Sequence, residues 1–297
     1  MAAALMVLAA GLLWGIVSLF TRPMGELGLS ALETSGVRSM LGAPLLALVL
    51  LVKDKSLLRI KLRDIWMFVG TGVVSFFFFN FLYFQCMELS EVSVAVILLY
   101  TSPVWLMFFG RLLFKERFTT AKIVALCLPV SGCVLVSGVL GGAVTLTPAA
   151  LLCGLASGFF YALYSVFGTI ALKKYNPFTV TFYSFLCAAV AAVFVSNPGH
   201  AIQIAVQDPA AILIYLGLTV VSSVTPYILY NSGLQHLEAS QAGILATAEP
   251  MMGCILGIFA YGESATPLKI IGIALIIAAL VISGLKPNKN VEGASRD

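Results

Sequence analysis

The chain contains one sequence pattern twice, at a constant spacing of 147 residues. Segments 91–103 and 238–250 are identical at 6 of 13 positions, which in the first segment are Glu91, Ser93, Ala95, Ile97, Leu98 and Pro103. About one identity is expected at residue frequencies of roughly 5–10% each. The same spacing relates Gly11 to Gly158, Ser18 to Ser165, Gly70 to Gly217, Tyr83 to Tyr230 and Glu116 to Glu263. The chain is therefore built from two copies of one unit, and its fold must accommodate both.

Both copies are too apolar for a water-soluble domain. Hydrophobic residues make up 60% of the chain and charged residues 10%, whereas soluble domains carry about 25% charged residues. Continuous apolar runs, which favour helices over a β-barrel, occur at about 2–21, 31–52, 65–86, 91–114, 122–140, 149–171, 178–196, 209–233, 239–260 and 268–285. Each is long enough to cross a hydrocarbon core of about 30 Å. We therefore predict an all-α membrane protein with ten transmembrane helices, the first retained rather than cleaved as a signal peptide.

Lysine and arginine residues predict how the chain crosses the membrane. If the N-terminus is cytoplasmic, 14 of the 17 lie in cytoplasmic connections, only Arg22 and Lys269 lie outside, and Arg38 lies within a span. This asymmetry places both termini in the cytoplasm of a multi-pass plasma-membrane protein. Each copy contributes five helices, so the second copy enters the membrane upside down relative to the first. We predict inverted repeats at 1–141 and 148–286, followed by a polar cytoplasmic tail at 287–297.

Several short motifs resemble those of the EamA family in the drug/metabolite transporter superfamily. In the first copy they are Trp14-Gly15, Arg38, Thr101-Ser102-Pro103, Phe114-Lys115-Glu116-Arg117-Phe118-Thr119 and Gly132. In the second copy they are Glu249-Pro250, Tyr261-Gly262-Glu263 and Thr266. The resemblance covers essentially the whole chain as two units.

This resemblance implies both a fold and a function. It implies a ten-helix bundle in which helices 1–4 and 6–9 surround a central cavity, with helices 5 and 10 packed outside. Members of the family move small metabolites, often amino acids and their derivatives, and many are exporters. The second copy departs from the first, with Phe185 in place of Arg38 and Tyr161-Ala162 in place of Trp14-Gly15. The two halves are therefore not functionally equivalent.

Glu249 is the strongest single candidate for a functional residue. It lies about halfway along the ninth predicted helix, where an acidic side chain costs roughly 2.5–3.5 kcal/mol to insert. The adjacent Pro250 removes a backbone hydrogen bond and frees a carbonyl about one turn earlier, near Ala246. An acid beside an opened backbone suits a substrate ammonium or a coupling proton. The alternative is a protonated Glu249 that is hydrogen-bonded within the helix packing.

Arg38 is the second charged candidate, about two turns in from the outer end of the second predicted helix. Its guanidinium suits bidentate binding of a substrate carboxylate. Two alternatives remain open at this point. The long side chain reaches the outer interface, or it pairs with Glu33.

Aromatic and hydroxyl side chains indicate the walls of a cavity. Trp14 and Ser18 are four residues apart on one helix face, and Tyr161 and Ser165 repeat this arrangement in the second copy. Such walls suit a small amphipathic ligand, although ordinary aromatic packing gives the same pattern. Weaker candidates, which equally suit interfacial anchoring, are Asn80, Tyr83, Tyr100, Tyr227, Tyr230 and Asn231.

Two matched residue pairs suggest structural roles. Pro103 and Pro250 occupy equivalent mid-helix positions, where they produce kinks that either serve gating or simply bend the helix. Glu116 and Glu263 lie at equivalent helix ends, where a solvated ion pair or a helix-end contact is expected rather than a substrate contact.

These features together predict a secondary transporter of small metabolites, of the amino-acid or related amphipathic class and acting as an exporter. The chain has no P-loop and no catalytic sequence motif, so we expect alternating access driven by a proton or substrate gradient and no enzymatic activity. The expected partners are a small-molecule substrate and membrane lipid, with no nucleic acid, cofactor or metal. The protein would be a monomer or a homodimer. A channel or an intramembrane enzyme is the alternative.

Overall fold

The computed structural model describes residues 1–297 except 91, 138, 140–146 and 285–297. The predicted tail at 287–297 and the predicted repeat ends at 141 and 286 fall outside the described residues. Within the described part, the chain forms helices and their connections, with no strand.

Helices of the first copy occupy residues 2–136. They are α1 (Ala2–Gly15), α2 (Ser18–Glu26), α3 (Ala31–Lys53), η1 (Lys55–Leu58), η2 (Leu62–Asp64), α4 (Ile65–Val69), η3 (Gly70–Phe77), α5 (Phe78–Leu89), α6 (Val92–Leu99), α7 (Ser102–Phe114) and α8 (Thr120–Val136). Helices of the second copy are α9 (Pro148–Leu172), α10 (Pro177–Val195), α11 (Pro198–Gln207), α12 (Ala210–Thr219), η5 (Val220–Val224), α13 (Thr225–Leu234), α14 (Ala239–Ala246), α15 (Ala248–Tyr261) and α16 (Pro267–Gly284).

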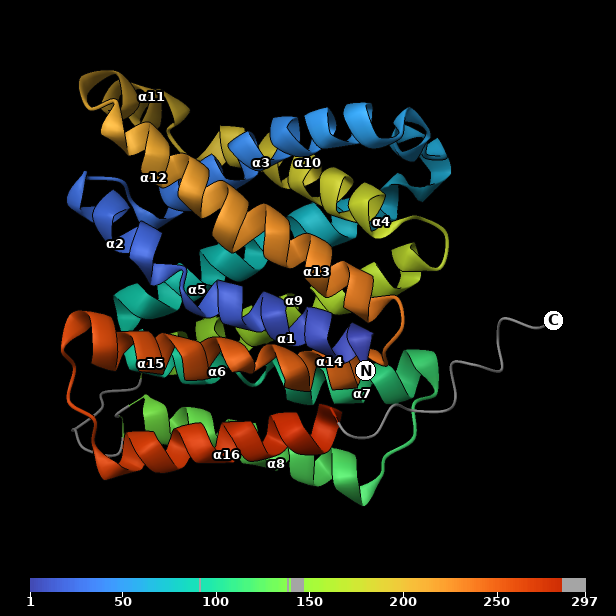
Figure 1. Ribbon diagram of the computed structural model, residues 1–297, viewed down its shortest axis with the longest axis vertical. Coiled ribbons are helices and arrows are strands. Elements are labelled where there is room, and N and C mark those ends of the chain that lie inside the picture. The colour runs from blue at the N-terminus through green and yellow to red at the C-terminus, as the bar shows by residue number, and fades with distance from the viewer. Residues whose placement is uncertain (91, 138, 140–146, 285–297) are drawn as a thin grey trace.

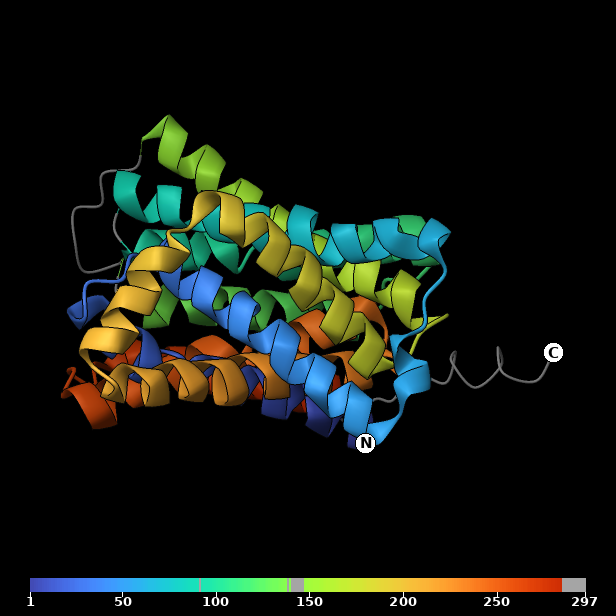
Figure 2. The ribbon, with the colours of Figure 1, turned by 90° about the horizontal axis from the view of Figure 1, so that it is seen from above.

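The prediction of an all-α membrane protein with ten spanning helices is confirmed. Nine segments of the described chain are long and apolar enough to span a membrane: Ala2–Glu26, Ala31–Lys53, Leu62–Leu89, Val94–Phe114, Pro148–Leu172, Pro177–Val195, Ala210–Leu234, Ala239–Tyr261 and Pro267–Gly284. The tenth, α8, is apolar but shorter, with 17 residues. Figures 1 and 2 show the long helices running in one common direction, as a membrane bundle requires. The apolar runs do not predict α11, which is a short helix of 10 residues begun by Pro198.

Two of the spans are broken at positions related by the 147-residue spacing. The fourth span is interrupted at Tyr100 and Thr101, between α6 and α7, and the ninth at Thr247, between α14 and α15. The expected mid-helix kinks at Pro103 and Pro250 are therefore helix starts, since each proline lies in the first turn of the new helix. A proline costs little there because its missing N–H would have no helical partner. Thr101 and Thr247 also bond back to carbonyls three residues earlier, with both O···O distances 2.6 Å.

Helices of the two copies alternate in the bundle. α8 packs against α16 at one edge, and α3 packs against α10 towards the other. Between these pairs, α1 packs against α13 and α5 packs against α9. Each pairing joins one copy to the other, as an inverted repeat requires.

Glycines permit close approach at both helix breaks. A Cβ at Gly11 would lie 3.1 Å from the Ala246 carbonyl oxygen, and a Cβ at Gly158 would lie 2.9 Å from the Leu98 carbonyl oxygen. The first helix of each copy thus contacts the broken helix of the other copy at the residues just before the break.

Candidate functional site

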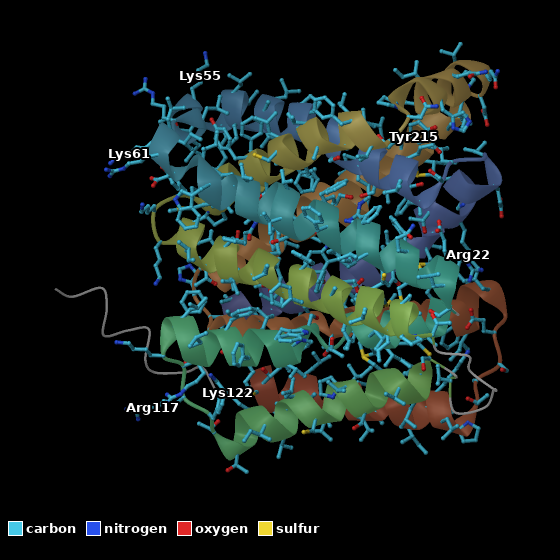
Figure 3. The ribbon with its side chains drawn as sticks, turned by 180° about the vertical axis from the view of Figure 1, so that it is seen from behind. Arg22, Lys55, Lys61, Arg117, Lys122 and Tyr215 are labelled. Atoms are coloured by element: carbon cyan, nitrogen blue, oxygen red, sulfur yellow. The ribbon has the colours of Figure 1, made fainter. Side chains whose placement is uncertain are left out.

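A central cavity of about 670 Å³ extends inward from one end of the bundle. This volume lies within the range of roughly 300–1,000 Å³ typical of small-molecule sites. Its mouth is lined by Arg22, Tyr261 and Glu263, and its interior by Arg38 and Glu249. Figure 3 shows Arg22 at one end of the molecule and Lys55, Lys61, Arg117 and Lys122 at the other. The cavity therefore reaches the end that is poor in basic residues.

Glu249 lies in the first turn of α15 and is half-buried. The Tyr161 hydroxyl of α9 donates to Glu249 Oε2 at 3.4 Å, and the Tyr100 side chain lies near the same carboxylate. Gly15 allows α1 to pack directly beside this residue, since a Cβ there would lie 2.6 Å from the Glu249 carbonyl oxygen. Three separate helices thus converge on one acidic group.

Arg38 lines the same cavity and is held by η5, a π-helical stretch of the eighth span. Its Nε donates to Ser223 Oγ at 2.9 Å and its Nη2 to the Ser222 carbonyl at 3.4 Å. The Phe76 ring lies 5.8 Å from the guanidinium carbon, within the range of a cation–π contact. The alternative pairing with Glu33 is wrong, because Glu33 Oε1 contacts His200 Nδ1 at 2.8 Å and Oε2 accepts from the Ser30 N–H at 2.7 Å.

Arg38 and Glu249 face one cavity without touching each other. No ion pair joins them among the contacts of the described chain, although each lies within the electrostatic field of the other. Two opposite charges that line one cavity without pairing present complementary partners for a ligand that carries both charges.

Aromatic side chains close the cavity towards the basic end of the molecule. The Trp14 ring lies 5.1 Å from the Tyr227 ring and 5.4 Å from the Tyr230 ring, centroid to centroid. Tyr230 in turn shares a hydrogen bond of 2.6 Å with Ser165. The void that remains within this layer is about 20 Å³, which has room for about one water molecule.

The residues predicted from the sequence divide between these two layers. Those that line the large cavity are Trp14, Ser18, Arg38, Asn80, Tyr83, Tyr100, Glu249 and Pro250. Those that line the small aromatic void are Trp14, Tyr161, Ser165, Tyr227 and Tyr230. Pro103 is buried but lines neither, and the Asn231 side-chain amide donates to Tyr164 and Thr181 within the packing.

Sequence reasoning missed the residues that fix Arg38 and those at the mouth. Nothing in the sequence around Ser223 and Phe76 distinguishes them from other residues of apolar spans. The only indication of polar positions nearby is the pair Ser75 and Ser222, which the 147-residue spacing relates and which precede them directly. At the mouth, the Arg22 guanidinium lies 3.5 Å from the Tyr261 ring centroid and 3.7 Å from Glu263 Oε1. These partners come from different helices, so no local pattern connects them.

Comparison with known proteins identifies the family. The model of the EamA-like transporter family matches residues 1–138 and again residues 148–285. This chain belongs to the EamA-like transporter family. The resemblance seen in the sequence motifs is thereby confirmed, and the protein is an integral membrane protein of a transporter family.

Curated relatives of this EamA-like transporter match between 69% and 96% of its length. An uncharacterized transporter of Archaeoglobus fulgidus is 31% identical over 69% of this chain and 73% of its own. The threonine/homoserine exporter RhtA of Escherichia coli is 29% identical over 71% of this chain and 68% of its own. A solved crystal structure that is 21% identical superposes with a TM-score of 0.78 over 98% of both chains. That last likeness concerns the fold alone.

Proposed function

We propose that this EamA-like transporter is a secondary transporter that exports amino acids or closely related zwitterions by alternating access. One observation carries the proposal: Arg38 and Glu249 present opposite charges to a single cavity with aromatic walls. A substrate carboxylate would bind the guanidinium, and the substrate ammonium would bind the Glu249 carboxylate. The threonine/homoserine exporter among the relatives supports this substrate class.

The asymmetry of the two ends supports alternating access. The cavity reaches the mouth at Arg22, while the aromatic layer around Trp14 closes it towards the basic end. At that closed end, α7 packs against α14. The symmetry-related pair, α15 and α6, has no comparable packing among the described residues. If α6 packed against α15 while α7 separated from α14, the cavity would open to the opposite side.

A proton or a substrate gradient would drive the exchange, with Glu249 as the group that takes up either a proton or the substrate ammonium. The basic end is the cytoplasmic end in this proposal, as the positive-inside rule implies. The protein would then reside in the plasma membrane and face outward in the conformation described. The predicted domain limits at 141 and 148 separate the two exchanging copies.

Reconstituted vesicles test the proposal. Labelled threonine and homoserine are expected to show saturable counterflow, and the unlabelled amino acid should compete. The methyl ester lacks the carboxylate and the N-acetyl derivative lacks the ammonium, so each should compete at least about tenfold less well. If both derivatives compete as well as the unmodified amino acid does, zwitterion recognition is contradicted. Flux that does not saturate would instead indicate a channel, and chemical conversion of the substrate would indicate an enzyme.

A further inference from the structure

A second cavity, separate from the central one, lies at the basic end of the molecule. Its volume is about 500 Å³, and its lining consists of Arg59, Ile60, Lys61, Arg63, Asp64, Lys174 and Tyr175. Among the described residues of this lining, four cationic side chains thus surround a single carboxylate. Figure 3 shows Lys61 at the end of the molecule far from Arg22, so this site does not belong to the mouth of the central cavity.

The one carboxylate of this basic cavity is already neutralised. Asp64 is buried, and its two oxygens accept from Lys174 Nζ at 2.8 Å and from the Tyr175 hydroxyl at 2.7 Å. Burial raises the pKa of Tyr175, which keeps the hydroxyl a protonated donor. Arg59, Lys61 and Arg63 form no ion pair within the described chain, although Arg59 lies in the electrostatic field of Asp54 and Arg63 in that of Asp64. Among the described residues of the cavity lining, cationic side chains therefore outnumber carboxylates.

The segment that carries these cations is fixed in place. The Thr179 hydroxyl of α10 donates to the Leu57 carbonyl at 2.8 Å, and the Tyr183 hydroxyl donates to the Leu58 carbonyl at 2.6 Å. The Lys61 N–H donates to the Tyr175 hydroxyl at 3.1 Å. These bonds hold η1 and η2 against the second copy, so the cationic side chains project from a positioned segment.

Large apolar side chains are exposed next to the same cations. Leu62 is 82% exposed, Trp66 is 47% exposed and Ile65 is 46% exposed. They lie on η2 and the start of α4, where the third span begins. Tryptophan is enriched at the level of the lipid headgroups. Apolar residues beside a cluster of cations match a ligand that has both an anionic group and a hydrocarbon part.

We propose that the basic cavity binds the phosphate headgroup of an anionic phospholipid, with Leu62, Ile65 and Trp66 packed among its acyl chains. Basic side chains beside spanning helices attract anionic lipids, and arginine forms paired hydrogen bonds with phosphate. A lipid bound here bridges the 59–63 segment of the first copy and Lys174 of the second. It therefore stabilises the contact between the copies at the closed end of the bundle.

Thermal unfolding of the purified full-length protein in mixed micelles tests the proposal. Phosphatidylglycerol is expected to raise the unfolding temperature in a saturable way, because a ligand of the folded state stabilises it. Phosphatidylcholine at the same concentration should have no such effect. The double variant Arg59→Gln and Arg63→Gln should bind phosphatidylglycerol about fivefold more weakly for each charge removed. Both residues are exposed, so the fold should persist, which circular dichroism checks.

A matched variant separates a site from general surface charge. Lys115→Gln and Arg117→Gln remove two exposed charges from the connection after α7, outside the cavity. This double variant should respond to phosphatidylglycerol as the unaltered protein does. An equal loss of response in both double variants would overturn the proposal, as would an equal response to phosphatidylcholine. Inorganic phosphate should give no shift, and a shift equal to that of the lipid would indicate a free-phosphate site instead.

Discussion

Ser223 gives Arg38 its orientation, and Ser222 provides a control at the next position. Ser223 accepts a hydrogen bond from Arg38 Nε, whereas the Ser222 hydroxyl is buried without a partner and contributes only its backbone carbonyl. Ser223→Ala should raise the Kd for the transported amino acid about tenfold, since bonds to charged groups contribute roughly 1.5–3 kcal/mol. Ser222→Ala should leave the Kd unchanged. Equilibrium binding to the purified variants measures both values, and equal effects would remove Ser223 from its positioning role.

Glu249 offers a test of what drives transport. Glu249→Gln keeps the size and polarity of the side chain but cannot exchange a proton. If Glu249 carries the coupling proton, counterflow should persist while uptake loses its dependence on a pH gradient. Tyr161→Phe is the matched control, since it removes the hydroxyl that donates to Glu249 Oε2 but leaves the carboxylate. Unchanged pH dependence and unchanged affinity in Glu249→Gln would exclude the residue from the mechanism.

At this scale the sequence indicated charges but not their partners. Arg38 and Glu249 stand out because ionisable groups are costly within a span. Their partners Ser223 and Tyr161 lie on other helices, 185 and 88 residues away along the chain. Hydroxyl groups are common in membrane spans, so only tertiary proximity distinguishes these two.

Among the elements, the ends of α7 and α15 form the same local structure in both copies. Lys115 and Gly262 adopt left-handed conformations with φ of 56° and 67°, and the next residues are Glu116 and Glu263. The Glu116 N–H donates to the Gly110 carbonyl at 2.9 Å, and the equivalent bond from Glu263 to Gly257 measures 3.0 Å. Each glutamate then pairs with a lysine of the following helix, Lys122 at 3.2 Å or Lys269 at 3.0 Å.

The surroundings of these two glutamates differ. The Glu116 side chain is 6% exposed, and the Glu263 side chain is 43% exposed. Glu116 accepts from Ser240 of α14, and Lys122 also pairs with Glu238 just before α14. Of the two expected roles, a solvated ion pair or a helix-end contact, Glu116 therefore has the helix-end contact, and its ion pair is buried by its partner on α14. These contacts fasten α7 to α14 at the closed end.

Glu116→Gln should loosen the closed end and favour opening towards it. A cysteine at Ser102, which lines the small aromatic void, should then react with a thiol reagent applied from the basic side. In a variant without native cysteines, the rate of this thiol reaction should rise about tenfold for each 1.4 kcal/mol by which the equilibrium shifts towards the form that is open at the basic end. Glu263→Gln changes the equivalent residue at the open end and should not raise the rate. Equal rates in the two variants would show that Glu116 does not fasten this end.

For the whole molecule, the charge asymmetry predicts a definite orientation. A cysteine at Arg22 should react with a membrane-impermeant reagent in intact cells, because Arg22 lies at the cavity mouth. A cysteine at Lys61 should react only after the membrane is permeabilised. Both positions are exposed and lie at opposite ends of the bundle. The reverse labelling pattern would place the basic end outside and contradict the positive-inside assignment.

Apolar length and loop charge act locally, so the amino-acid pattern predicts the duplication, the membrane environment and the inverted arrangement of two five-helix units. The pattern also marks Arg38 and Glu249 as unusual, because each breaks both the apolar pattern and the symmetry of the repeat. Which end is closed, that η5 holds Arg38, and that Glu116 is buried while Glu263 is exposed are visible in the folded structure alone. Because the two copies are similar, either end of the bundle could close in the same way. Contacts between helices far apart in the chain determine which end does.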